Sequence, residues 1–403
     1  MHRRRPTLFL PLIALLVAVF LASCGGGEET STTPSEPAEP LTLGSVFSTT
    51  GIGAPFGPQQ VAGANLAAEQ VNEDGGIDGA EITIEQIDDA SEPKRSARAM
   101  KTLASKEDAV AILGPTFSNS AAEADPVANE LGVPVLAVSN TGPGIVGECP
   151  YPCELVFRDS LGEATAIPAN IENFAGSEEA EKATVIYPLD DPFADTSSLI
   201  AARAFEDNKI AVTGREAFAP LEAGPQPAIE EAIEHKADAI FIAASSGEVA
   251  VSAIEIAREL GFEGEILGGN AFNSTVAAKE AGADGVGARS AAAWYAGNES
   301  ETNASFIEAY RDAYDAEPDQ FAAQAYTGVL LLAEAAQNAD LSGDLAADRE
   351  ALAAALAEVE VDTPLGEFAF TADHDVVQPI WVVEMDGDGG YELIEEVPPE
   401  VPE

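Results

Sequence analysis

Residues 41–51 read LTLGSVFSTTG and residues 82–90 read ITIEQIDDA, and the local structure of the chain is clearest in these two stretches. Each begins with a short run rich in β-branched and other apolar residues and ends in polar turn residues, which predicts strands at 41–47 and 81–87. The Ala-rich segment 57–72 between them has the length and spacing of an amphipathic helix. Strand, helix and strand in this order form a βαβ unit, the building block of a parallel sheet covered by helices on both faces.

The same alternation continues along most of the chain. Roughly 360 residues after the N-terminal part exceed what one hydrophobic core holds, so we expect two domains. The end differs, with an extended segment at 379–385, a hairpin turn at 387–391 and an acidic, Pro-rich tail at 395–403 that we expect to be disordered. Further strands are predicted at 109–113, 134–138, 183–187, 239–243, 265–267 and 291–294, and helices at 93–106, 119–131, 194–208, 249–260, 301–315, 319–338 and 347–359.

The N-terminus predicts export. Three arginines at 3–5 precede an apolar run from Leu8 to Leu21, which is short for a membrane-spanning helix and typical of a secretory signal at 1–23. The following Cys24 ends a sequence, LASC, that resembles the lipobox of bacterial lipoproteins, so Cys24 is the candidate lipid anchor to the cell membrane. Residues 24–40 are rich in Ser, Thr, Pro and Glu and indicate a flexible linker. The alternative is an ordinary signal or membrane anchor with a chance Cys.

The charge of the chain excludes nucleic acid as a partner. The sequence holds 19 Lys and Arg against 70 Asp and Glu, a formal charge of −51, and removal of the three signal arginines makes it −54. The acids are spread over the whole chain, which indicates an acidic solvated surface and a fold that depends on ionic strength. Cys149 and Cys153 are predicted to form a disulfide, because the chain is exported and offers no second cysteine pair or His cluster for a metal.

A series of motifs follows in order at 43–51, 72–79 (NEDGGIDG), 82–90, 110–115 (VAILGP), 133–141, 184–193 and 239–244. Through these motifs the chain, from Leu41 onward, resembles the leucine/isoleucine/valine-binding periplasmic proteins of ABC importers. The resemblance implies a type I periplasmic binding protein fold of class α/β, with two Rossmann-like lobes joined by a multi-crossing hinge. It places 41–158 and 296–368 in an N-terminal lobe and 159–295 and 369–394 in a C-terminal lobe. It implies an ABC permease as membrane partner, a small-molecule ligand, and no metal or organic cofactor.

Strand ends in such sheets are where ligands bind, because loops there lead into helix N-termini that attract anionic groups. Polar strand ends occur at 49–50, at 115–120 (PTFSNS) and at 139–142 (SNTG). Thr50 and Ser120 are interpreted as helix N-caps. The resemblance implies that Ser118 and Thr141 hold a ligand carboxylate and that the Ser139 carbonyl accepts from its amine. The ligand-binding residues that it predicts are Phe56, Phe117, Ser118, Ser139, Asn140, Thr141, Phe193, Ser245 (or Ser246) and Asn270.

Asn270 departs from the family pattern. Amino-acid binders of the family place a carboxylate here to pair with the ligand's ammonium, and a neutral amide does not offset the desolvation of that cation equally. Asp190 or Asp191 are candidate substitutes. The ligand is therefore expected to be an amino acid held differently or, alternatively, an amide, a urea-like compound or a carboxylic acid.

Two other functions compete with transport. A lipid-anchored sensor would use the same lobes to pass a signal to a partner protein. An enzyme is disfavoured, because no nucleophile elbow, zinc-protease motif or phosphate loop occurs. His235 lies in a charged helix surface and His374 in a polar turn, so solvation explains both better than catalysis.

Overall fold

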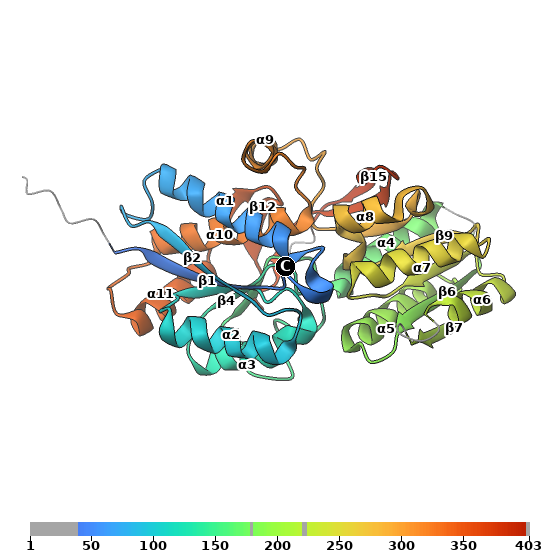
Figure 1. Cartoon of the computed structure of the whole chain (residues 1–403), viewed down its shortest axis with the longest axis horizontal. Coiled ribbons are helices and arrows are strands. Elements are labelled where there is room, and N and C mark those ends of the chain that lie inside the picture. The colour runs from blue at the N-terminus through green and yellow to red at the C-terminus, as the bar shows by residue number, and fades with distance from the viewer. Residues whose placement is uncertain (1–38, 178–179, 220–223, 400–403) are drawn as a thin grey trace, which may run out of the picture. The chain divides into compact units, whose positions relative to one another are not determined.

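Two sheets with parallel strands at their centres carry the fold (Figure 1). The computed structural model describes residues 39–177, 180–219 and 224–399, all within one compact unit. Cys24, the predicted signal peptide and most of the predicted linker lie outside the described residues. Among the described helices, none is long and apolar enough to cross a membrane.

The first sheet is parallel throughout, with the strand order β2-β1-β3-β4-β5. Side chains alternate between its faces: Leu43 and Phe47 pack under α1 and α10, whereas Val46 and Ile112 pack under α2 and α3. Both faces are therefore buried, as the apolar strand runs predicted. The elements are β1 (Leu41–Phe47), β2 (Ile82–Asp88), β3 (Ala111–Leu113), β4 (Val135–Ala137), β5 (Val156–Arg158), α1 (Gly57–Glu73), α2 (Pro93–Lys106), α3 (Ser118–Glu130) and α10 (Gln320–Asn338), with the 3₁₀ turn η1 (Gly51–Gly53) before α1.

The second sheet has the order β15-β14-β10-β9-β8-β6-β7, parallel from β10 to β7 and antiparallel at β14 and β15. Alternation again separates two cores: Ile240 and Ile242 face α6 to α8, whereas Phe241 faces α4 and α5. The elements are β6 (Lys182–Pro188), β7 (Ala211–Phe218), β8 (Ala239–Ile242), β9 (Glu265–Gly268), β10 (Arg289–Ala292), β14 (Ile380–Met385), β15 (Tyr391–Val397), α4 (Glu163–Ser177), α5 (Pro192–Asp207), α6 (Gln226–Glu234), α7 (Gly247–Glu259), α8 (Thr275–Ala281) and the 3₁₀ turns η2 (Asn270–Asn273) and η3 (Gly282–Gly285).

The chain passes between the sheets three times: after β5, after β10 and before β14. The second passage carries Trp294 into the first core, where it packs edge-on to Phe306. Before the third passage lie α9 (Glu301–Tyr314), α11 (Leu345–Leu356) and a small antiparallel sheet of β11 (Glu360–Thr363), β12 (Gly366–Phe370) and β13 (Val376–Val377). The predicted α/β class with two sheets is confirmed, whereas the residue limits of the lobes stay a prediction.

Three expectations need correction. The tail is not disordered from 395, because β15 runs to Val397 and pairs with β14 through backbone hydrogen bonds. The acidic side chains of β15 do not prevent this pairing, because only backbone groups take part in it. The strand expected at 291–294 ends at Ala292, since the Ala293 N–H donates to the Gln320 side chain instead of a strand partner. Ser120 is not an N-cap: α3 begins at Ser118 and its N-cap is Phe117.

Candidate ligand-binding site

A narrow cavity lies where loops from both sheets meet. Its free space is about 30 Å³, room for one or two water molecules. An amino-acid-sized ligand therefore requires the surrounding side chains or lobes to move apart. The residues that line it are Phe56, Thr116, Phe117, Ser118, Asn119, Ser139, Thr141, Phe193, Ala244, Ser245, Asn270, Ala271 and Phe321.

Eight of the nine predicted ligand-binding residues line this cavity. The exception is Asn140, which is fully buried and donates from Nδ2 to the Pro115 carbonyl at 2.8 Å. Asn140 therefore fixes one strand-end loop against the other. The geometry brings the predicted residues together, and their role toward a ligand stays a proposal.

One end of the cavity suits an anionic group. Ser118 is the first residue of α3, and the N-cap Phe117 has no side-chain acceptor for the first N–H groups of the helix. The Ser118 Oγ accepts from the Gly142 N–H at 3.1 Å. Its own proton stays available, so the hydroxyl and the positive helix end together favour a carboxylate.

The two hydroxyls of the neighbouring loop differ in availability. Ser139 Oγ donates to the Thr116 carbonyl at 2.7 Å and accepts from Gln60 Nε2 at 2.9 Å, so its proton is already used inside the protein. Thr141 is buried, and its Oγ1 has no hydrogen bond of good geometry among the described residues. Of the two hydroxyls, that of Thr141 is therefore the better placed to donate to a ligand, whereas the role of the Ser139 carbonyl stays a prediction.

Four phenyl rings form the apolar wall. Phe56 packs against Phe321 with ring centroids 4.6 Å apart and meets Phe117 edge-on at 6.0 Å, and Phe193 contributes from α5. Phe321 was missed from the sequence, because it stands at the start of α10 in an apolar helix pattern that reads as ordinary core. The wall is suited to an aliphatic or aromatic body.

Asp191 joins the two sides of the cavity without lining it. As the N-cap of α5 it accepts from the Ala194 N–H, and its carboxylate also accepts from Asn119 Nδ2 at 3.0 Å and from Ser245 Oγ at 2.5 Å. Asp190 is exposed and outside the lining. Of the two candidate substitutes for the missing carboxylate, only Asp191 contacts cavity residues.

Glu163 is a second carboxylate directly behind the lining, and sequence reasoning missed it. It is the first residue of α4, only 1% exposed, and its Oε1 accepts from the Asn270 N–H at 2.8 Å. A Cβ on Gly269 would stand 2.7 Å from both carboxylate oxygens, so only glycine leaves them room. Burial raises the pKa of Glu163 to about 7, although the Asn270 N–H and the Thr141 hydroxyl oppose this.

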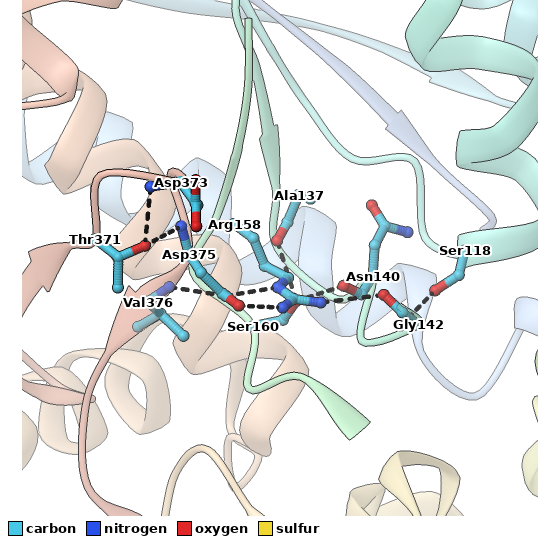
Figure 2. A network of polar contacts seen from close by, with 10 residues as sticks. All are labelled: Ser118, Ala137, Asn140, Gly142, Arg158, Ser160, Thr371, Asp373, Asp375 and Val376. Carbon is cyan, nitrogen blue, oxygen red and sulfur yellow. Dashed lines mark hydrogen bonds and ion pairs between the residues drawn. The ribbon is translucent and has the colours of Figure 1, made fainter. Parts of the chain in front are cut away.

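Arg158 holds the 139–142 loop in place (Figure 2). Its guanidinium pairs with both oxygens of Asp375 and donates from Nη1 to the Gly142 carbonyl at 3.1 Å. Gly142 in turn donates to Ser118, as the same figure shows. A residue near the C-terminus therefore positions the loop through one buried arginine.

None of the lining residues is charged. The arrangement offers hydroxyl and N–H donors at one end, phenyl rings along the side, and the carboxylates of Glu163 and Asp191 one layer behind. His374 lies elsewhere, stacked on Phe157 with ring centroids 4.0 Å apart, which gives it a packing role. Cys149 and Cys153 are disulfide-bonded, as predicted.

Comparison with known proteins finds curated relatives and solved structures that are similar to this chain. An amino acid binding protein of Pseudomonas aeruginosa is 36% identical over 96 residues, 24% of this chain. Alignments with such curated relatives span only 26–31% of their length. Among solved structures, the isoleucine-bound branched-chain amino acid transporter protein of Streptococcus pneumoniae has a TM-score of 0.78 at 24% identity, covering 89% of this chain and 99% of its own. The benzoate-bound solute-binding protein of an R. palustris ABC transporter has a TM-score of 0.80 at 23% identity, covering 90% and 98%.

These solved structures share the fold of this chain. The family model for the periplasmic binding protein matches residues 40–390, nearly all of the described residues. The chain therefore belongs to the periplasmic binding protein family.

Proposed function

We propose that this chain is the extracytoplasmic substrate-binding protein of an ABC importer. The observation that carries the proposal is the cavity between the two sheets, which a helix N-terminus, hydroxyl groups and four phenyl rings line together. Such a site binds a small solute as the lobes close, and the closed form is what a permease recognises.

The first candidate ligand is a hydrophobic amino acid such as leucine, isoleucine or valine. Ser118, Thr141 and the start of α3 would hold its carboxylate and the phenyl rings its side chain. Its ammonium needs an anionic partner, and Glu163 and Asp191 are the carboxylates in contact with lining residues. Opening of the cavity for a ligand would have to bring one of them to the amine.

The second candidate is a carboxylic acid without an ammonium, for which benzoate is the simplest aromatic example. Four phenyl rings and the lack of any charged lining residue favour it. A solute-binding protein with this fold has been solved with benzoate bound, which supports this candidate.

One matched pair separates the candidates: L-leucine and 4-methylpentanoate, which is leucine without its ammonium. Calorimetric titration and thermal unfolding should be run with both, with isoleucine, valine and benzoate, and with Glu163→Gln and Asp191→Asn. Saturation by a ligand at about 100-fold its Kd adds about 2.7 kcal/mol to the free energy of unfolding. Tighter binding of leucine that one of the two variants abolishes supports the amino acid. Equal or tighter binding of 4-methylpentanoate supports the carboxylic acid. A folded protein that binds none of these ligands contradicts the transport proposal and favours a sensor with another ligand.

The proposal includes a lipid anchor at Cys24, supported by the lipobox-like LASC sequence and the polar residues that follow. Metabolic labelling with a radioactive fatty acid should mark the wild-type protein and leave Cys24→Ser unlabelled. Equal labelling of both forms would contradict the anchor.

A further inference from the structure

A second cavity, of about 240 Å³, lies beside the chain segment that leaves β10. Its walls come from that segment, from the start of α10 and from the β14–β15 hairpin. By the same measure it has several times the free space of the ligand-binding site. The proposed transport function gives it no role.

Asp319 forms its buried acidic wall. The residue is fully buried and caps α10, with Oδ1 accepting from the Ala322 N–H at 3.0 Å. Its Oδ2 accepts no hydrogen bond of good geometry from any residue that the structure describes. The backbone N–H groups of Phe321 and Thr275 also act on this carboxylate, but neither makes a well-aligned hydrogen bond to Oδ2, so a cation beside that oxygen would lower the cost of burying it.

Three aromatic residues, Trp294, Tyr295 and Tyr391, also line the cavity. The polar tips of two of them are already used, since Trp294 Nε1 donates to Asn303 at 2.7 Å and the Tyr391 hydroxyl donates to the Phe272 carbonyl at 2.6 Å. These two rings therefore offer carbon surface to the cavity rather than donors. Aromatic surface beside an anionic group attracts organic cations.

The rim is also negative. Glu317 and Asp388 are exposed lining residues, and no Lys or Arg belongs to the lining. Glu317 is paired with Arg311 at 2.7 Å, so most of its charge is compensated. Among the ion pairs of the described residues, none includes Asp319 or Asp388.

We propose that this cavity is a second ligand site, which binds a small organic ammonium ion between Asp319 and the rings of Trp294, Tyr295 and Tyr391. Its volume lies below the about 300–1,000 Å³ of drug-sized pockets, so the ligand has few non-hydrogen atoms. The chemistry differs from that of the ligand-binding site described above, where the lining polar groups are uncharged.

The titration of Asp319 supports this assignment. Burial raises its pKa to about 7, against the backbone N–H groups around it, chiefly that of Ala322. The titratable groups that face it are Tyr391 and Tyr310, with Glu317 and Asp388 at the rim. Both tyrosines hold their protons because their own pKa values are raised. An ammonium ion selects ionised Asp319, so affinity should rise as the pH increases through about 7.

The test uses the full mature chain and two probes of the same shape, choline and its neutral isostere 3,3-dimethyl-1-butanol. Saturable binding of choline should be seen by calorimetry or ligand-observed NMR, and the alcohol should bind at least about tenfold more weakly. Asp319→Asn keeps the N-cap acceptor and removes the charge, so it should weaken choline binding by about tenfold or more. Tyr295→Leu keeps apolar bulk and should weaken it about fivefold.

Two controls separate this site from other causes. Glu259→Gln removes an exposed charge at the far end of α7 and should leave choline binding unchanged, which excludes general attraction to an acidic protein. Ser118→Ala alters the cleft and should also leave it unchanged. No saturation up to about 10 mM choline, equal binding of the alcohol, or full binding by Asp319→Asn overturns the proposal. Should Asp319→Asn fail to fold, the probe pair and Tyr295→Leu decide.

Discussion

Replacing Glu163 by Gln should make the protein more stable at neutral and alkaline pH. Glu163 is buried behind the cleft, where Oε1 accepts from Asn270 and Oε2 has no hydrogen bond of good geometry among the described residues. Glutamine keeps the Oε1 acceptor and places an NH₂ group near Thr141, whose hydroxyl also lacks a well-formed bond. The variant therefore resembles the protonated, uncharged form of Glu163.

The size of the effect follows from the pKa of Glu163, which burial raises from 4.5 to about 7. A carboxyl with a raised pKa binds more protons in the folded state, so its contribution to stability is complete below about pH 4.5 and is lost as the pH rises through about 7. The loss amounts to about 3 kcal/mol once the pH is above 7. The Glu163→Gln variant has no such loss, so it should gain that amount on the wild type between about pH 4.5 and 7.5.

Urea unfolding of both proteins at several pH values between about 4.5 and 8 measures the difference directly. Glu172→Gln is the matched control, because it removes an exposed carboxylate from the same helix and should change the free energy of unfolding little at any pH. The other acids, including Asp319, titrate equally in all three proteins and cancel in the comparison. Parallel curves for wild type and Glu163→Gln, or a variant that is less stable at pH 8, would refute the reasoning.

Three further outcomes are expected. Ser118→Ala should weaken ligand binding at the ligand-binding site about tenfold in calorimetry, because it removes one hydrogen bond to a charged group, and it should also lower the melting temperature of the free protein, because the Gly142 N–H loses its acceptor; unchanged affinity would contradict the assigned carboxylate end. Asp375→Asn should lower the free energy of unfolding by about 1–3 kcal/mol in urea, since the buried Arg158 loses its charged partner, whereas a neutral effect would show that the pair only positions the loop. Raising NaCl from about 0.01 M to about 1 M should raise the melting temperature, because salt screens the repulsion between the charges of a chain with a formal charge of −51. An unchanged melting temperature would mean that repulsion between the acidic residues does not destabilise the fold.

Local sequence signals were sufficient for the βαβ units. The helix at Pro93–Lys106 has the predicted limits, because proline at its start and a polar turn after it mark both ends. Strands without an apolar pattern were missed: β7, Ala211–Phe218, mixes Thr, Gly, Arg and Glu with apolar residues at an edge of the second sheet. The acidic strand β15 was missed for a related reason: it too lacks an apolar pattern, and backbone hydrogen bonds to β14 hold it in the sheet.

The polar loops of the cleft were predictable because strand ends and helix starts are adjacent in sequence. Glu163 was not, since its contact with Asn270 joins residues 107 positions apart and its own surroundings read as an ordinary helix start. Long-range contacts decide whether a glutamate in a helix is solvated or buried, and the sequence around Glu163 gives no sign of its contact with Asn270.

Gln320 shows how such long-range contacts join the parts of the site. Its Oε1 accepts from the Ala293 N–H in the segment that leaves β10, and its Nε2 donates to Asn270 Oδ1 in the cleft at 2.7 Å. The same residue lines the second cavity. Because the two ends of one amide group contact the segment that leaves β10 and Asn270, a ligand that displaces Gln320 from Asn270 Oδ1 would also disturb the contact with that segment. In that case ligand binding and the geometry of that segment would be linked, and the linkage would act equally in both directions.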